Sequence, residues 1–223
     1  GTKYTDPIDG SSCRAFLPYG YSTLRKNALC PGTLSLERHR LLWLYLKEKT
    51  KLLEKNISVL HIAPEIIFIK KFKKITNWNY VTIDLKSPLA DIKANVYNLP
   101  FKENYFDLIL CNHVLEHIED DYKALNELYR VIKNKGTLIA QVPLDKNLKT
   151  TFENKEIKNR RDRNKYFGQY DHLRVYGLDF YNRLSNSGFK PKKVDILKKI
   201  SIEEKIKYCL PNDEEIPVGI AIK

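Results

Sequence analysis

NVYNLPFKENYFDLILCNHVLEHIEDD, residues 95–121, combines a loop, an apolar run and a helix start in one unbroken stretch. The run Phe106–Cys111 is short, nearly all apolar and bounded by polar residues, which is typical of a strand covered on both faces of a parallel sheet. Asn112 and His113 follow where this strand ends. Because ligands of open α/β sheets bind beyond the carboxyl ends of the strands, both side chains are candidates for ligand contact. Asn112 has the alternative role of capping the next turn.

Earlier strands place a second candidate at the same edge of the predicted sheet. Ile57–Ile62 is predicted as the first core strand, and it runs through the turn 63–65 into an apolar-periodic helix. Residues 80–83 form a second strand that ends in Asp84, at the spacing of about twenty residues expected for a carboxylate that binds ribose hydroxyls. A third strand is expected at 91–95. The pattern predicts a nucleotide-binding α/β fold.

Charge in the first turn separates two cofactor classes that this spacing leaves open. A dinucleotide brings a pyrophosphate, which requires a glycine-rich turn without an added anion. This turn has no glycine and carries Glu65. S-adenosylmethionine instead carries a sulfonium and an ammonium group, so Coulomb attraction makes a carboxylate favourable there. The turn therefore favours S-adenosylmethionine over a nicotinamide dinucleotide.

Four blocks of sequence occur together in one order: Asn98–Phe101, Tyr105–Asp107, His113–His117, and Arg130–Lys133 followed by Gly136. With these blocks the chain resembles class I S-adenosylmethionine-dependent methyltransferases of the type 11 branch, firmly over residues 57–143 and loosely over 166–197. The resemblance implies an α/β, Rossmann-like sheet of seven mostly parallel strands with a last antiparallel strand and helices on both faces. It also implies S-adenosylmethionine as the cofactor.

The resemblance assigns the cofactor to the carboxyl edge of the sheet, with departures from the family pattern. The family usually has an acidic residue where His61 stands and glycine where Ala63 stands. Asn95 matches a position where an aspartate often contacts the adenine amino group, and an amide oxygen accepts that hydrogen bond too. The expected cofactor-binding residues are His61, Ala63, Pro64, Glu65, Asp84, Leu85, Asn95, Val96, Asn112 and His113.

Residues 1–34 are predicted to form an irregular arm that covers part of the core. Cys30-Pro31 followed by residues 35–40 resembles a methyltransferase subgroup in which a zinc-ribbon-like segment precedes the first helix. Here Thr33 stands where a second cysteine would complete a CxxC, and only Cys13 remains upstream. Structural zinc needs four Cys or His ligands. We therefore expect no metal site, and an arm that serves as packing or as a substrate wall.

Periodicity and caps predict the other elements of the domain, which we place at 35–223. Ser35 can cap a helix that runs to about Thr50. Asp120 or Asp121 starts a helix that Lys135-Gly136 breaks. The chain then continues with a strand at 137–142, a helix at 177–187 and strands at 192–196 and 216–222.

The segment 144–176 is predicted to act as a lid or substrate segment. Between Lys146 and Lys165 it holds eight lysines and arginines against three acids, and Thr150 with Glu153 has capping-box spacing. Its closure would exclude water from a substrate. A solvated surface is the alternative role.

YFGQYDHLRVY, residues 166–176, is the richest cluster of reactive and aromatic side chains. His172 is the first candidate for a general base, because imidazole titrates near neutrality, and His113 is the second. His117 is expected to pack beneath the helix start. Arg174 is a candidate for holding an anionic group. The predicted substrate-binding residues are Tyr170, Asp171, His172, Arg174 and Tyr176, with Asp171 or Tyr176 orienting the histidine.

Composition limits the remaining function classes. The 223 residues suit one domain, without an apolar stretch of the ~18 residues a membrane span needs and without an export signal. Four cysteines without a CxxC pair predict a reducing, cytoplasmic compartment. The net charge of +12 leaves a nucleic-acid partner open, but lysines spread along the whole chain favour a solvated surface.

The favoured function is transfer of a methyl group to a small acceptor, anionic or sugar-like. RNA methylation is the rival within catalysis, supported by the charge but by no recognisable RNA-binding module. A methyltransferase-like binding subunit without catalysis is a third hypothesis, motivated by the missing glycines. A nicotinamide oxidoreductase is a weaker fourth.

Overall fold

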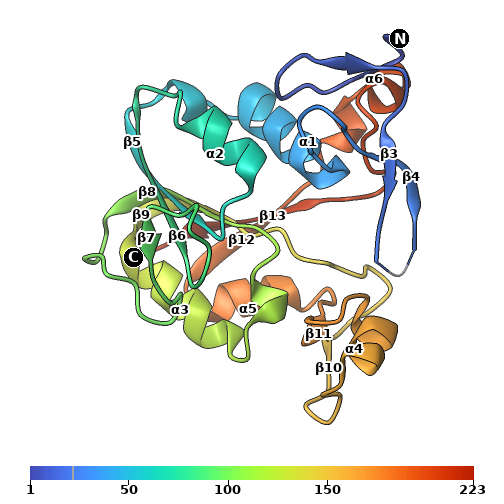
Figure 1. Cartoon of the computed structure of the whole chain (residues 1–223). Helices are drawn as coiled ribbons and strands as arrows, with labels where there is room; N and C mark the ends of the chain where they lie inside the picture. Colours follow the sequence, from blue (N-terminus) through green and yellow to red (C-terminus); the bar gives the residue numbers. More distant parts are fainter. Residues whose placement is uncertain (22) are drawn as a thin grey trace.

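The computed structural model describes residues 1–21 and 23–223. Seven strands form one sheet in the order β12-β13-β9-β8-β5-β6-β7 (Figure 1). Neighbours from β9 to β7 pair in parallel, whereas β13 is antiparallel to both β9 and β12. This confirms the predicted Rossmann-like sheet. Its strands are β5 Ile57–Ile62, β6 Trp78–Asp84, β7 Ile92–Lys93, β8 Phe106–Cys111, β9 Ile132–Ile139, β12 Phe189–Val194 and β13 Ile216–Ala221.

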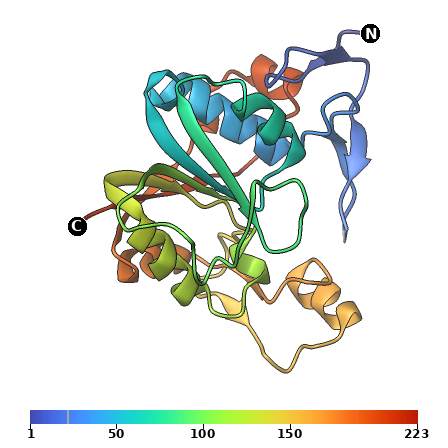
Figure 2. The same cartoon turned by 60° about the vertical axis from the view of Figure 1, so that its left-hand side comes forward.

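Helices cover both faces of the sheet (Figures 1 and 2). On one face, α1 (Glu37–Leu44) and α2 (Ile66–Phe72) pack, while α3 (Asp121–Val131) and α5 (Phe180–Asn186) pack on the other. Phe68 and Phe72 lie one helical turn apart on α2 and are fully buried, as are Leu125 and Leu128 on α3. Burying each such side chain contributes roughly 1.5–3 kcal/mol. Among the described residues, no helix is long and apolar enough to cross a membrane.

Smaller elements gather at one side of the sheet, and the C-terminus lies at the other side in both views (Figures 1 and 2). Two hairpins form in the N-terminal arm, which the sequence predicted to be irregular. A second group follows β9 and contains two short paired strands with a helix between them. These elements are β1 Tyr4–Thr5, β2 Ser12–Cys13, β3 Leu17–Tyr19, β4 Arg25–Leu29, β10 Phe152–Glu153, α4 Arg160–Phe167 and β11 Arg174–Val175, with α6 Ile202–Lys207 near the C-terminal strand.

A buried guanidinium ties the arm to the domain. Arg40 on α1 is fully buried, and its five N–H groups donate to oxygens of three segments. These acceptors are the carbonyl of Ala28 in the arm, the carbonyl and hydroxyl of Ser35, and the carbonyls of Tyr208 and Cys209 beyond α6. The arm is therefore a fixed part of the fold.

Local capping predictions fail in the first helix because tertiary contacts claim the polar side chain. Leu36, not Ser35, is the N-cap of α1, and the Ser35 hydroxyl donates to Asp6 at 2.6 Å instead. The predicted break at Lys135-Gly136 is also wrong. Helix α3 ends at Val131, and β9 begins directly and runs through these residues, with Lys135 at φ +61°.

The expected capping box at Thr150 and Glu153 is wrong for a similar reason. Glu153 lies in β10, where it forms ion pairs with Arg174 at 2.9 Å and Arg183 at 3.2 Å. The helix of this segment begins at Arg160 instead, and the Asn159 side chain accepts a hydrogen bond from its first turn. Glu153 is thus used in ion pairs between elements and not in a helix cap.

Two glycines at helix ends predict different costs for the same substitution. Gly188, after α5, has φ +94°, and an added Cβ would lie 2.5 Å from the Tyr129 ring, which packs edge-on against Phe189. Gly168, after α4, has φ +82° with open space around it. We expect Gly188→Ala to cost about 2–4 kcal/mol and Gly168→Ala about 1–2 kcal/mol of unfolding free energy, measured by urea denaturation. Equal costs would contradict a role for the Tyr129 contact.

Candidate functional site

The parallel register brings the strand ends to one edge of the sheet. The last residues of β5 pair with those of β6 and β8, so the segments that follow these strands begin side by side. The Ala63 N–H donates to the Ile83 carbonyl at 2.8 Å, and the His113 N–H donates to the Gln141 carbonyl at 2.8 Å. Ala63, Asp84, Asn112 and His113 thus lie along this edge, where ligands of such sheets bind.

The first turn at this edge contains a hydrogen-bonded chain that ends in a carboxylate. His61 is fully buried, with Nδ1 2.8 Å from the Tyr80 hydroxyl and Nε2 2.9 Å from the Glu65 carboxylate. Because a carboxylate accepts, Nε2–H donates to Glu65 and Nδ1 accepts from Tyr80. His39 on α1 lies 3.6 Å from the other Glu65 oxygen. His61 therefore meets a ligand only through Glu65, which it orients.

Electrostatics keep Glu65 charged in this partly covered position. Burial opposes its ionisation, but the hydrogen bond from His61 lowers the pKa of Glu65 to about 2. Burial, with the nearby Arg38 guanidinium, lowers the pKa of His39 to about 3, so that ring is neutral. Ala63 has φ +47°, a left-handed conformation that favours glycine, the residue of the family pattern.

Other predicted cofactor residues have free polar atoms at the edge. One Asp84 oxygen accepts from the N–H groups of Lys86 and Ser87, each at 2.7 Å, and among the described residues the other oxygen accepts no hydrogen bond. Asn112 is buried, and within residues 1–21 and 23–223 its amide nitrogen has no partner. The Asn95 amide oxygen accepts from the Tyr97 N–H at 3.0 Å.

The three remaining predicted cofactor residues differ in exposure. Leu85 is half exposed, Val96 is 9% exposed, and Pro64 is intermediate. Leu85 and Pro64 can thus present apolar surface beside the free carboxylate oxygen and Glu65. Val96 belongs to the core beneath α3.

A cavity of about 1070 Å³ adjoins this edge at His113. That volume is at the upper end of the range for small-molecule sites. Its walls come from four parts of the chain: the arm and α1, the connection after β8, the connection after β9, and the segment between α6 and β13. Aromatic and titratable side chains that line the cavity include Tyr19, Tyr21, Arg38, His113, Glu116, His117, His172 and Glu214.

The N-terminal arm and the segment after α4 contact each other beside this cavity. Tyr21 of the arm and Tyr170 after α4 form an edge-to-face pair with ring centroids 6.2 Å apart. Both rings are substantially exposed on their other sides. The N-terminal arm and the segment after α4 are thus in contact at the edge of the cavity, which Tyr21 lines.

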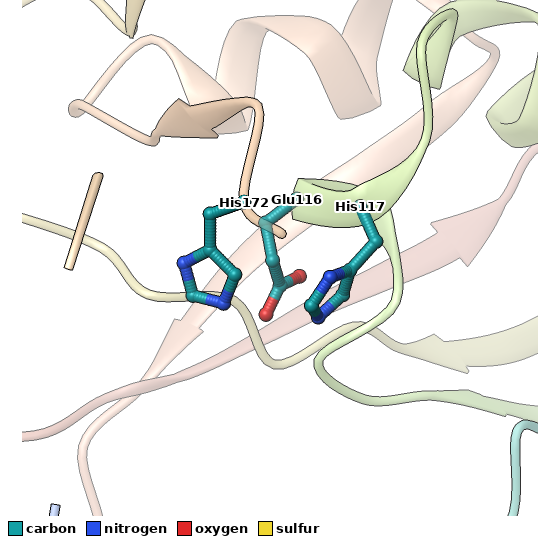
Figure 3. A group of neighbouring side chains, drawn as sticks. All are labelled: Glu116, His117 and His172. Atoms are coloured by element: carbon teal, nitrogen blue, oxygen red, sulfur yellow. The ribbon is translucent and has the colours of Figure 1, made fainter. Parts of the chain in front are cut away.

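Both candidate bases line the cavity, together with two residues to which the sequence assigned no chemistry. His113 Nδ1 lies 3.1 Å from Glu116, and Glu116, His117 and His172 form one group (Figure 3). Burial lowers the pKa of His113 and of His172, so both rings are neutral near pH 7. Burial opposes ionisation of Glu116, yet the hydrogen bond with His113 holds its pKa below the ordinary value.

The expectation that His117 packs beneath the helix start is wrong. Its side chain is about a third exposed and faces the cavity, with Nδ1 3.5 Å from the Asp171 carboxylate. The signal was present in the quoted motif, because Glu116 and His117 belong to the same HVLEH block as His113. Their neighbour His172 comes from the distant segment 168–172, which the motif alone does not place.

Arg174 and Tyr176 do not line the cavity. The Arg174 guanidinium is occupied by Glu153 and by the carbonyls of Leu115, Ile118 and Glu119. Tyr176 is fully buried, and its hydroxyl donates to Asp121 at 2.8 Å. Their contacts join the lid segment to the start of α3. Of the predicted substrate residues, His172 faces the cavity, while Tyr170 and Asp171 lie beside it.

Arg38 and Glu214 are cavity residues that sequence reasoning missed. The Arg38 Nε is buried without a hydrogen-bond partner in the described part of the chain. Glu214 lies in the connection to β13, near Arg38 and Glu37, and its carboxylate accepts from the Gln141 amide at 3.4 Å. Burial raises the pKa of Glu214 to about 7, against the attraction of Arg38. No local pattern predicts that these segments meet.

Both the sequence and the fold of the chain are similar to those of known methyltransferases. Residues 48–140 match the family model of a methyltransferase domain. A S-adenosylmethionine-dependent methyltransferase from Archaeoglobus fulgidus has a solved structure that superposes with a TM-score of 0.52 at 13% identity, covering 81% of this chain and 93% of that one. Residues 48–140 are thus similar to a methyltransferase domain, and the chain shares its fold with this solved methyltransferase.

Sequence relatives match part of the chain. An uncharacterized protein of Methanocaldococcus jannaschii is 41% identical over 90 residues, which are 40% of this chain and 34% of that protein. A ubiquinone/menaquinone biosynthesis C-methyltransferase of Vibrio cholerae is 42% identical over 48 residues, 22% of this chain and 18% of the relative. The chain thus spans about a third or less of the length of these curated relatives.

Glu214 makes stability depend on pH. Its folded-state pKa of about 7 exceeds the ordinary 4.5, so between these values the folded state binds more protons and stability falls as pH rises. From pH 5 to pH 8 we expect wild type to lose roughly 1–3 kcal/mol of unfolding free energy relative to Glu214→Gln, measured by urea denaturation. The exposed control Glu156→Gln should keep the wild-type slope. Parallel pH profiles for Glu214→Gln and wild type would contradict the assignment.

Proposed function

We propose that this chain is a S-adenosylmethionine-dependent methyltransferase that acts on a small acceptor, anionic or sugar-like. The observation that carries the proposal is the position of the cavity. It opens from His113, the residue that follows the edge formed by Ala63, Asp84 and Asn112. A cofactor on the edge and an acceptor in the cavity would thus be neighbours, and proximity of this kind supplies most of the rate in a displacement reaction.

The edge residues fit S-adenosylmethionine by their chemistry. The free Asp84 oxygen can accept from ribose hydroxyls, and the unpartnered Asn112 amide nitrogen offers a buried donor to the cofactor's carboxylate. Glu65, held ionised by His61, attracts a cationic group. The turn 63–65 offers no glycine cradle for a pyrophosphate. When bound, the cofactor supplies a methyl group activated by its sulfonium.

Cavity residues support the choice of acceptor. Arg38 presents a guanidinium whose Nε is free of protein partners in the described residues, and such a fork binds carboxylate or phosphate well. Tyr19 and Tyr21 add aromatic faces, which suit a sugar ring. His113 and His172 are neutral rings on the cavity wall, so either can take the proton that the acceptor loses as its bond to the methyl carbon forms.

Asp84→Asn tests the cofactor site. The substitution keeps an oxygen for the Lys86 and Ser87 N–H groups but removes the charge that would strengthen hydrogen bonds from ribose. We expect micromolar binding of S-adenosylmethionine by wild type and at least about tenfold weaker binding by the variant, measured by isothermal titration calorimetry. Asp107→Asn is the control: it makes the same change at the amino end of β8, at the other edge of the sheet from Asp84, and should bind as wild type. Absence of binding to the wild-type protein would overturn the proposed activity.

Arg38→Met tests the acceptor class. In a panel of small acceptors with labelled S-adenosylmethionine, we expect turnover of anionic or sugar-like compounds. The variant should raise KM for anionic acceptors by about 10–100-fold with a smaller change in kcat, because a charge-assisted contact is lost. Arg161→Met, exposed on α4, is the control and should leave KM unchanged. Cofactor binding without turnover of any acceptor would favour the binding subunit, and methylation of RNA alone would favour an RNA enzyme.

A further inference from the structure

Two segments that are far apart in sequence are held together beside the cavity. Glu116 and His117 lie in the 3-10 turn Leu115–His117 after β8, and His172 lies between α4 and β11. The Leu173 N–H donates to the Glu116 carbonyl at 2.8 Å, and the Arg174 guanidinium bridges the carbonyls around this turn. The relative placement of the three side chains is therefore set by the backbone before any ligand arrives.

Their potential ligand atoms converge. One nitrogen from each imidazole and one oxygen of Glu116 all lie within 4.8 Å of one another. Figure 3 shows the carboxylate between the two rings. Atoms bound to one metal ion at about 2.0–2.2 Å lie roughly 3–3.5 Å apart, so modest side-chain rotations would complete the contraction. All three side chains line the cavity, which leaves the remaining coordination positions open toward it.

Glu116 lacks the partner that its burial demands. The residue is fully buried, and His113 occupies only Oε1, at 3.1 Å. Among the described residues Oε2 has no hydrogen-bond partner. A buried carboxylate oxygen without a partner costs free energy, and native proteins satisfy such groups with protein, water or an ion. Oε2 belongs to the same carboxylate that lies between the two imidazole rings.

The two histidines are held in forms suited to ligation. His172 Nδ1 lies 3.1 Å from the Phe167 carbonyl, which only accepts, so Nδ1 carries the hydrogen and Nε2 keeps its lone pair. His117 Nδ1 lies 3.5 Å from the Asp171 carboxylate. A ring whose one nitrogen faces an oxygen acceptor while the other stays free is the usual arrangement of metal-binding histidines.

We propose that Glu116, His117 and His172 bind a divalent first-row transition metal, with open coordination positions on the cavity side. Two imidazoles and one carboxylate suit Zn²⁺ and its neighbours, whereas Mg²⁺ and Ca²⁺ prefer oxygen ligands. The site stands on these side chains alone and needs no methyl transfer. Within the proposed methyltransferase it would hold an oxygen atom of the acceptor, and it would leave His113 as the free base.

Metal binding is measured on the full chain after removal of metals by chelator and dialysis. We expect Zn²⁺ to bind with one-to-one stoichiometry in calorimetry, and Mg²⁺ to bind far more weakly. Co²⁺ should give visible absorption bands of nitrogen and oxygen coordination. Glu116→Gln and His117→Gln should each weaken Zn²⁺ binding at least about 100-fold, and Asp171→Asn, which removes only the supporting carboxylate, about 10–100-fold. His117 is partly exposed, so its variant should fold even if the Glu116 variant does not.

Cys13→Ser is the matched control. Cys13 and Cys30 are the two cysteines of the N-terminal arm, and desolvation together with the Cys30 thiol raises the pKa of Cys13. This pair is the alternative soft-ligand site. We expect this variant to bind Zn²⁺ as wild type does. Loss of binding in Cys13→Ser with retention in His117→Gln would overturn the proposal. Intense thiolate-to-cobalt absorption, or no stoichiometric Zn²⁺ binding by wild type, would overturn it as well.

Discussion

Arg40 holds the arm, the start of α1 and the end of α6 around one guanidinium. All five of its N–H groups are used, and the acceptors are four backbone carbonyls and the Ser35 hydroxyl. Burial lowers the pKa of Arg40, opposed by the charge of Asp6, so this interior cation depends on saturation of its hydrogen bonds. The cavity wall formed by Tyr19, Tyr21 and Glu214 rests on that anchor.

The turn after β5 carries a carboxylate in a different position from the one that the resembling family uses. Class I relatives usually carry an acid at the position of His61, and here the carboxylate comes from Glu65, four residues later and bonded to that histidine. Tyr80 fixes the ring from the neighbouring strand. The carboxylate therefore lies four residues later in the chain than in the family pattern. Ala63 adopts a left-handed backbone conformation at the position where the family has glycine. The negative charge of the motif is thus present near this turn although the acidic motif residue is replaced by His61.

Strands were predictable because buried parallel strands are continuous apolar runs, as in Phe106–Cys111 and Ile57–Ile62. Their shared carboxyl edge followed, and with it the placement of Asp84, Asn112 and His113. The cavity was only partly predictable. Arg38 on α1 and Glu214 before β13 are brought together at Gln141, whose amide donates to the Arg38 carbonyl and to the Glu214 carboxylate, and no local period encodes that contact. Within 144–176, the spacing of Thr150 and Glu153 suggested a helix start, whereas Glu153 pairs with Arg174 and Arg183, which are distant in sequence.

The segment between β9 and α5 begins and ends at one place. Leu144 bridges to Tyr176, the Asp145 N–H donates to the Tyr176 carbonyl, and the Tyr176 N–H donates to Pro143. These hydrogen bonds hold the two ends of the loop together. The entropic cost of joining the ends of a loop rises only slowly with the number of residues between them. Evolution can therefore lengthen, shorten or replace the insert while the sheet folds as before. The insert supplies His172, so such exchanges would change the side chains that line the cavity and leave the sheet unchanged.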